Sequence, residues 1–258
     1  MYGGVKMFNI YEKDILMNDN ILYLFNKSIY EYDMKNAGYS LSKAYNLLPE
    51  ETLGKLGKYK KDRRTVEIGK IQRSNSEFKN NLQQAFKDAR KLFFEANELD
   101  INDVISIKKD AIFTTKYCKY QNFLDFIEFR PKNTYSSYIR LNKKVELYYS
   151  PIQLDIKGLG DESIEYHRDY MIKFINTFFS KMETDNEVNT LRFLRSFVDK
   201  YKNRELDIEY YRRFDRDSYF DIVGDTLQYK DYWQENINDI DISFNYFEVL
   251  MKLVKIPL

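Results

Sequence analysis

The sequence holds a single cysteine, Cys118, and a single histidine, His167, among its 258 residues. These counts exclude a disulfide framework, a zinc site built from Cys and His, and any site that needs two histidines. We expect Cys118 to fill space in the core and His167 to be a structural residue beside a helix, because nothing predicts that they meet. One free cysteine is typical of a reducing compartment, which predicts the cytoplasm of a bacterial host cell.

Long apolar runs and an excess of one charge are also missing. No stretch of about 18 apolar residues exists, and residues 1–20 lack the basic start and apolar middle of a signal peptide. We therefore expect no membrane contact. Lys and Arg number 41 and Asp and Glu number 40, which gives a net charge of +1. This balance excludes a protein that coats nucleic acid through its overall charge, although it allows a local basic groove.

Common nucleotide-binding and hydrolase motifs are absent. The chain contains no G-x-x-x-x-G-K-[ST], no G-x-G-x-x-G and no G-x-S-x-G. It has only nine Gly and four Pro, while Lys, Asn, Tyr, Ile and Phe are frequent, which indicates AT-rich coding. We expect a Gram-positive bacterium, or one of its phages, as the source.

Apolar spacing predicts an α+β fold with strands early and helices late. Residues 77–97 carry apolar side chains three and four apart, as in an amphipathic helix. Asn36 is expected to begin an earlier helix that ends before Pro49. Short strands are expected at 21–25 and 29–33, joined by Asn26 to Ser28, and in a hairpin at 104–107 and 111–114.

The predicted secondary structure changes in the second half of the chain. Residues 117–160 predict a β-meander, whereas residues 161–258 are expected to be mostly helical and to end in a helix at 247–254. We therefore expect an antiparallel sheet with helices on one face in residues 1–160, followed by a helical domain in residues 161–258.

With Cys–His sites and the common motifs excluded, carboxylates are the remaining candidates for catalytic groups. Asp33 ends an apolar strand just before a helix, and Asp110 lies inside the apolar hairpin. A charge at the edge of a buried sheet is costly unless it is paired or bound to a metal. Mg²⁺ prefers one or two carboxylates together with substrate phosphates. Each aspartate, taken alone, is also compatible with a turn or capping role.

The order strand–Asp33–helix, basic segment, long helix, strand–Asp110–strand resembles the palm of right-hand nucleic-acid polymerases. Tyr-Asp-Met-Lys-Asn-Ala-Gly-Tyr-Ser at 32–40 resembles their first metal-binding motif. Lys-Lys-Asp-Ala-Ile-Phe at 108–113 resembles the end of the D-T-D-S-I-F hairpin of family B DNA polymerases. Lys-Ile-Gln-Arg-Ser-Asn-Ser-Glu-Phe at 70–78 is similar to the fingers motif K-x-x-x-N-S-x-Y-G, with one extra residue.

The resemblance implies a minimal template-dependent polymerase in which Asp33 and Asp110 are catalytic and hold Mg²⁺ or Mn²⁺. Nucleoside triphosphates and nucleic acid would be its partners. Gly38 stands where these families usually carry a bulky side chain against the ribose 2′-hydroxyl, so ribonucleotides would fit. The implied substrate-binding residues are Arg63, Arg64, Lys70, Arg73, Gly38 and Tyr39. The implied nucleic-acid contacts, in the meander, are Lys132, Tyr135 and Arg140, with Tyr138 and Lys144 nearby. The helices after residue 161 would replace a thumb.

Several alternatives stay open. Lys109, not a carboxylate, precedes Asp110, which leaves a third metal-side carboxylate unassigned and makes an inactive palm one alternative. The separation of 110 − 33 = 77 residues is short for fingers and would also fit one subunit of a split polymerase. Asp217, in Asp-Arg-Asp-Ser-Tyr-Phe at 215–220, competes with Asp110 as the second ligand. The basic run also fits a solvated face, and the tyrosines fit a core.

Two further functions compete with the polymerase. One is a non-catalytic phage accessory protein that binds nucleic acid or protein through a degenerate palm. The other is a phage structural or assembly protein without a ligand.

Overall fold

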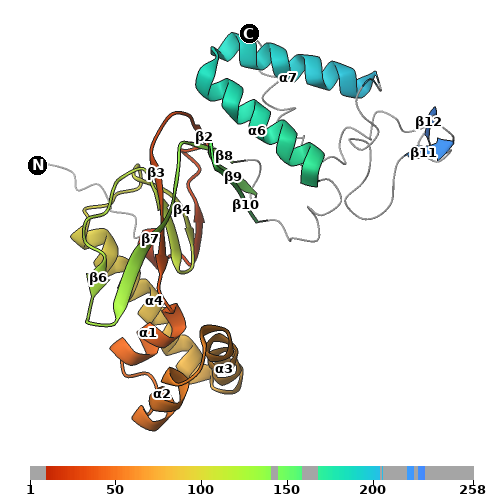
Figure 1. The fold of residues 1–258 in the computed structure, drawn as a ribbon. Coiled ribbons are helices and arrows are strands. Elements are labelled where there is room, and N and C mark those ends of the chain that lie inside the picture. Colours follow the sequence, from red (N-terminus) through yellow and green to blue (C-terminus); the bar gives the residue numbers. More distant parts are fainter. Residues whose placement is uncertain are drawn as a thin grey trace, which may run out of the picture. The chain divides into compact units, whose positions relative to one another are not determined.

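The computed structural model describes residues 10–140, 145–158, 168–203, 205, 220–223 and 226–229, and the fold is α+β with antiparallel sheets (Figure 1). The chain forms two compact units. Unit 1 comprises Met1–Ile21 and Ser28–Thr134, and unit 2 comprises Leu22–Lys27 and Tyr135–Leu258. The predicted boundary between residues 160 and 161 lies outside the described residues.

Unit 1 is built on a six-stranded sheet with the strand order β1-β4-β5-β3-β7-β6. The predicted hairpin of β4 and β5 is confirmed, with Lys109 and Asp110 between its strands. β3 pairs antiparallel with β5, so that Asp33 lies opposite Ala111. The strands are β1 (Ile15–Met17), β3 (Ile29–Met34), β4 (Val104–Lys108), β5 (Ala111–Thr114), β6 (Asn122–Phe123) and β7 (Ile127–Tyr135).

Within the described residues of unit 1 there are four α-helices, and the longest, α4 (Ser76–Ala96), confirms the predicted amphipathic helix. The Asn75 side chain caps it by accepting a hydrogen bond from the Phe78 amide at 2.9 Å, an N-cap interaction that was not predicted. A short 3₁₀ helix, η1 (Ile10–Glu12), packs against α4. The other helices are α1 (Ala37–Ala44), α2 (Glu50–Gly57) and α3 (Lys61–Ser74).

The core of unit 1 lies between α4 and the sheet, where aromatic rings meet. Phe93 is fully buried, and its ring centroid lies 4.5 Å from that of Phe129 and 5.3 Å from that of Tyr32. The Tyr32 hydroxyl accepts a hydrogen bond from the Cys118 amide at 2.7 Å. Burial raises the pKa of the Cys118 thiol to about 12, which fits its expected place as a core residue.

Unit 2 contains the sheet β10-β9-β8-β2, in which β8, β9 and β10 form the later part of the predicted meander. The earlier part of that predicted region, β6 and β7, lies in the sheet of unit 1. Two helices follow, as expected for the region after residue 161, and the ring of Phe179 in the first of them stacks on Tyr149 at 4.8 Å. The elements are β2 (Tyr23–Leu24), β8 (Ser137–Arg140), β9 (Glu146–Ser150), β10 (Gln153–Lys157), α6 (Arg168–Thr184), α7 (Glu187–Lys202), β11 (Phe220–Val223) and β12 (Thr226–Tyr229).

Two features of the strands were not predicted. Residues 21–25 and 29–33 do contain strands, but β2 pairs with β8 in unit 2 while β3 lies in the sheet of unit 1. The Lys27 amide donates to the Ser136 carbonyl, so the connecting residues follow unit 2 instead of forming a hairpin turn. The β11–β12 hairpin interrupts the region expected to be mostly helical. His167, Asp217 and the helix expected at 247–254 lie outside the described residues.

Candidate active site

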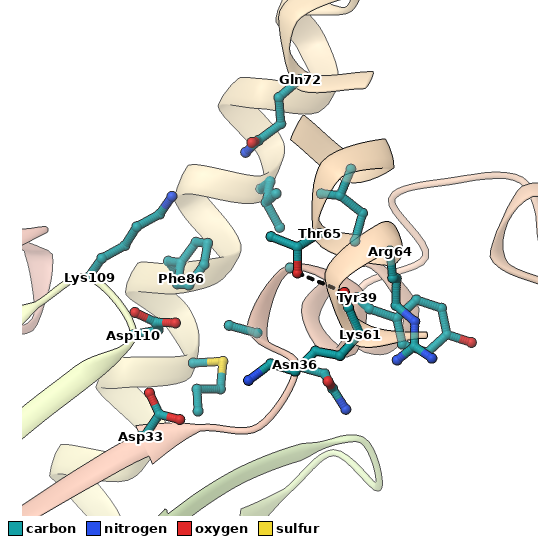
Figure 2. Close-up of a pocket in the computed structure, with 15 residues that line it drawn as sticks. Asp33, Asn36, Tyr39, Lys61, Arg64, Thr65, Gln72, Phe86, Lys109 and Asp110 are labelled. Atoms are coloured by element: carbon teal, nitrogen blue, oxygen red, sulfur yellow. Dashed lines mark hydrogen bonds between the residues drawn. The ribbon is translucent and has the colours of Figure 1, made fainter. Parts of the chain in front are cut away.

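Asp33 and Asp110 come together at one end of the sheet of unit 1. Asp33 is the penultimate residue of β3, and Asp110 lies in the turn between β4 and β5. Because β3 and β5 are neighbours, the Met34 amide donates to the Asp110 carbonyl at 2.9 Å. Figure 2 shows both carboxylates beside each other on one side of a pocket. The structure therefore places together two carboxylates that are 77 residues apart in the sequence.

The electrostatics of the two carboxylates differ. Burial, and next the negative charge of Asp33, raise the pKa of Asp110 above its ordinary value. The Asp33 carboxylate accepts a hydrogen bond from the Arg130 guanidinium at 3.3 Å and retains 19% of its side-chain exposure. A divalent cation between the two groups would relieve their mutual repulsion, which is the physical reason to consider a metal here.

The pocket has a volume of about 290 Å³ and carries opposite charges on its walls. The two aspartates lie on one side, and helix α3 contributes Lys61 and Arg64 from the other (Figure 2). Lys109 also lines the pocket, with its ammonium nitrogen 5.0 Å from the Phe86 ring centroid. A ligand that carries a phosphate chain and a divalent cation would complement both walls.

Three of the six predicted substrate-binding residues line the pocket, namely Gly38, Tyr39 and Arg64. Arg64 is already engaged, since its guanidinium donates to the Leu56 and Tyr59 carbonyls at 3.0 and 2.8 Å. The central carbon of the Arg64 guanidinium, Cζ, also lies 4.6 Å from the Tyr39 ring centroid. Arg64 therefore fixes the end of α2 as well as bordering the pocket.

Arg63, Lys70 and Arg73 are not among the residues that line the pocket. Lys70 pairs with Glu67 at 2.8 Å, and the Arg73 Nε donates to the Gly69 carbonyl. The reason is helical geometry, because an α-helix turns 100° per residue and presents one stripe to each neighbour. The stripe of α3 that faces the pocket is Lys61, Arg64, Thr65, Ile68 and Gln72. Lys61, Gln72 and Lys109 were not predicted from the sequence, although the three- and four-residue spacing of that stripe could have identified the first two.

The predicted nucleic-acid contacts are divided between the units. Lys132, in unit 1, lies 3.3 Å from the Glu31 carboxylate and keeps 45% of its side-chain exposure. Tyr135, in unit 2, is only 1% exposed and donates its hydroxyl hydrogen bond to Asp155. Tyr138 is fully buried and bonds Glu146, so both tyrosines are core residues and not a stacking surface. Arg140 ends β8, and Lys144 lies outside the described residues.

The metal-binding capacity of the site rests on two carboxylates. Among the residues that the structure describes, no cluster of three or more His, Cys, Asp and Glu side chains forms a metal site. Glu31 lies two residues before Asp33 in β3, but it is buried and accepts a hydrogen bond from Asn133 at 2.6 Å. Asp33 and Asp110 would thus need phosphate oxygens and water as further ligands, which is the arrangement that Mg²⁺ favours.

Comparison with known protein families gives one match, over residues 6–258, to the family described as Bacteriophage PBS1 gene 130 protein. The chain belongs to this phage protein family. No curated protein matches the chain. Within the described residues, no helix is both long enough and apolar enough to cross a membrane.

The buried charge of Asp110 leads to a prediction on stability. In this phage protein, Asp110→Asn is expected to raise the free energy of unfolding at neutral pH by about 1 kcal/mol, because it removes a desolvated charge beside Asp33. The pKa of Asp110 is raised in the folded state, so the cost is full above that pKa and disappears as the pH falls through it. Urea unfolding of both proteins from pH 7 to pH 4, without metal, measures the difference. A constant difference across that range would contradict the prediction.

Proposed function

We propose that this phage protein is a template-dependent nucleic-acid polymerase that transfers nucleotidyl groups with the help of two Mg²⁺ or Mn²⁺ ions. The observation that carries the proposal is the juxtaposition of Asp33, near the end of β3, and Asp110, in the turn that leads into the neighbouring strand β5, at a pocket whose other residues include Lys61 and Lys109. Their order in the sequence and their placement at one end of neighbouring strands are compatible with the polymerase palm that the motifs resemble.

In this proposal, Asp33 and Asp110 hold the metal ions through their carboxylate oxygens. Bound there, the ions would activate the attacking 3′-hydroxyl and neutralise charge on the leaving pyrophosphate. Lys61 and Lys109 contribute positive charge for the triphosphate, and the first turn of α1 lies at the pocket beside them. Arg130 would exchange its contact with Asp33 for a phosphate when a cation binds.

Gly38 supports the use of ribonucleotides. It lines the pocket in the first turn of α1, and a Cβ atom there would come within 3.3 Å of the Ile68 side chain. The neighbouring Tyr39 ring lies under the Arg64 guanidinium, and its hydroxyl points to the Leu53 carbonyl at 3.4 Å. Neither residue therefore fills the space next to Asp33 that a ribose would occupy.

Gly38→Ala is expected to lower the ratio of ribonucleotide to deoxyribonucleotide incorporation by about tenfold, which corresponds to about 1.4 kcal/mol of added discrimination against ribonucleotides. The added methyl group would press against the Ile68 side chain, which also lines the pocket, and would so narrow it. Competition between NTPs and dNTPs in one extension reaction measures the ratio. Gly54→Ala serves as a control, since a Cβ atom at Gly54 meets no atom within 4 Å. An unchanged ratio in Gly38→Ala would remove the assigned role of Gly38.

The test of the proposed function is primer extension by the full chain on DNA and RNA templates, with Mg²⁺ or Mn²⁺ and with NTPs or dNTPs. Extension that depends on both template and metal supports the polymerase. No extension under any of these conditions would contradict a polymerase that acts alone.

A non-catalytic nucleic-acid-binding protein is the second candidate function. It is favoured by the ion pair that Arg130 makes with Asp33 and by the enclosure of Glu31, which together leave few carboxylate oxygens for metal. Salt-dependent binding of DNA or RNA without extension, weakened by removal of Lys61, would support this alternative.

A further inference from the structure

Arg90 is a buried cation in the middle of α4. Its side chain has no exposed surface, and the guanidinium donates hydrogen bonds in three directions. The acceptors are the Tyr11 carbonyl at 2.7 Å, the Lys109 carbonyl at 2.8 Å and the Asp14 carboxylate at 2.8 Å. Burying a guanidinium carries a desolvation cost, and an apolar side chain would pack against the sheet without that cost. Packing alone therefore does not explain why an arginine occupies this position.

The turn that carries Asp110 is the segment that Arg90 holds. Lys109 has a φ of 58°, a left-handed conformation that is strained for a residue with a Cβ atom. Both backbone polar groups of Lys109 are bound, since its amide donates to the Asp14 carbonyl at 2.6 Å and its carbonyl accepts from Arg90. A strained conformation persists only when its surroundings fix it in this way.

The same segment fixes the aspartate itself. The carbonyl of Asp110 accepts from the Met34 amide, one residue after Asp33. The turn is thus tied on one side to β3, which carries the other carboxylate, and on the other side to Arg90 and Asp14. Burial lowers the pKa of Arg90, while the charges of Asp14 and Asp110 act in the opposite direction, so Arg90 also lies within electrostatic reach of Asp110.

We propose that Arg90 and Asp14 are positioning residues that hold the Lys109–Asp110 turn in its strained conformation, so that the Asp110 carboxylate stays beside Asp33 for a divalent cation. This inference rests on the proposed function, since it assigns a purpose to the metal pair. Residues that orient metal ligands from behind typically change metal affinity by about 10- to 100-fold when they are removed.

The experiment measures Mn²⁺ binding to the full chain by electron paramagnetic resonance, without nucleotide. Arg90→Met and Asp14→Ala are each expected to weaken Mn²⁺ binding by about tenfold or more. Arg90→Lys keeps the charge but cannot reach three acceptors, and we expect an intermediate loss. Arg192→Met, at an exposed position of α7, is the matched control and should bind Mn²⁺ as the unaltered protein does.

Lys109→Gly separates positioning from packing. Glycine adopts a φ of 58° without strain, so the turn would no longer depend on the clamp. We therefore expect Arg90→Met to weaken Mn²⁺ binding less when Lys109→Gly is also present. The double variant is compared with Lys109→Gly alone, and Arg90→Met is compared with the unaltered protein. If Arg90 acted only by packing α4, Lys109→Gly would not reduce the loss of Mn²⁺ affinity that Arg90→Met causes. Asp14 is 42% exposed, so Asp14→Ala decides the question if Arg90→Met does not fold.

The possible failures are distinguishable. If the unaltered protein binds no Mn²⁺ in a manner that requires Asp33 and Asp110, the proposed metal site is wrong. If the unaltered protein binds Mn²⁺ through both aspartates, but Asp14→Ala and folded Arg90→Met bind it equally well, the positioning role is overturned and the metal site stands.

Discussion

Asp33→Asn and Asp110→Asn are each expected to lower nucleotide incorporation at least about a thousandfold, which corresponds to about 4 kcal/mol of transition-state stabilisation. An asparagine keeps the size of the side chain and the backbone hydrogen bonds of β3 and the turn. It removes the negative charge that would hold a cation against the triphosphate. Single-turnover primer extension with saturating Mg²⁺ measures the loss of rate, and circular dichroism verifies the fold of each variant.

Asp125→Asn is the matched control for this prediction. Asp125 is exposed in the turn before β7 and has a φ of 55°, a conformation that asparagine also tolerates well. This variant should retain full extension. If Asp110→Asn retained extension while Asp33→Asn lost it, another carboxylate would supply the second ligand, and Asp217→Asn would be the next variant to measure. Extension that survives both substitutions would contradict the assigned site.

Phe93→Ala is expected to lower the free energy of unfolding of unit 1 by about 3–5 kcal/mol, because it leaves a cavity where the surroundings cannot collapse. Phe93 is fully buried, and three rings surround it, with centroids 4.5 Å (Phe129), 5.3 Å (Tyr32) and 6.3 Å (Phe123) away. Aromatic pairs of this kind add stabilisation beyond their buried area. Urea unfolding, followed by the fluorescence of the tyrosines and by circular dichroism, measures the change.

Val66→Ala is the control for this truncation. Val66 lies on α3 with 52% exposure, so removal of its methyl groups leaves no cavity. We expect a change within about 0.5 kcal/mol. A loss below about 1 kcal/mol for Phe93→Ala would show that the aromatic cluster is not the centre of the core that the structure describes.

Local patterns predicted the elements of the fold better than their partners. The α4 helix and the β4–β5 hairpin follow from apolar spacing in continuous segments, and both are confirmed. The pairing of β2 with β8 could not be predicted, because Tyr23 and Ile139 are more than one hundred residues apart and neither strand carries a signal for its partner. The β11–β12 hairpin was missed since its residues lie within a region that otherwise has helical spacing.

The candidate site was predictable where a residue's position follows from the backbone. Asp33 and Asp110 lie at ends of strands, so pairing of those strands places them together. Lys70 and Arg73 were predicted from the resemblance to the fingers motif and Arg63 from its positive charge, but the rotation of α3 decides which of its side chains meet the pocket. Arg90 gave no sequence signal at all, since it stands on the apolar face of α4 and its acceptors are mostly backbone carbonyls.

The path of the chain between the two units has a consequence for biosynthesis. Residues 22–27 belong to unit 2, although residues on both sides of them belong to unit 1. Strand β2 is therefore synthesised long before β8, the neighbour that completes its hydrogen bonds, and must wait for it as an unpaired strand. No single cut in the polypeptide separates the two units intact. A gene fragment that encodes only residues 135–258 would yield a sheet without its edge strand, so a separately expressed unit 2 requires the early segment in trans or a circular permutation.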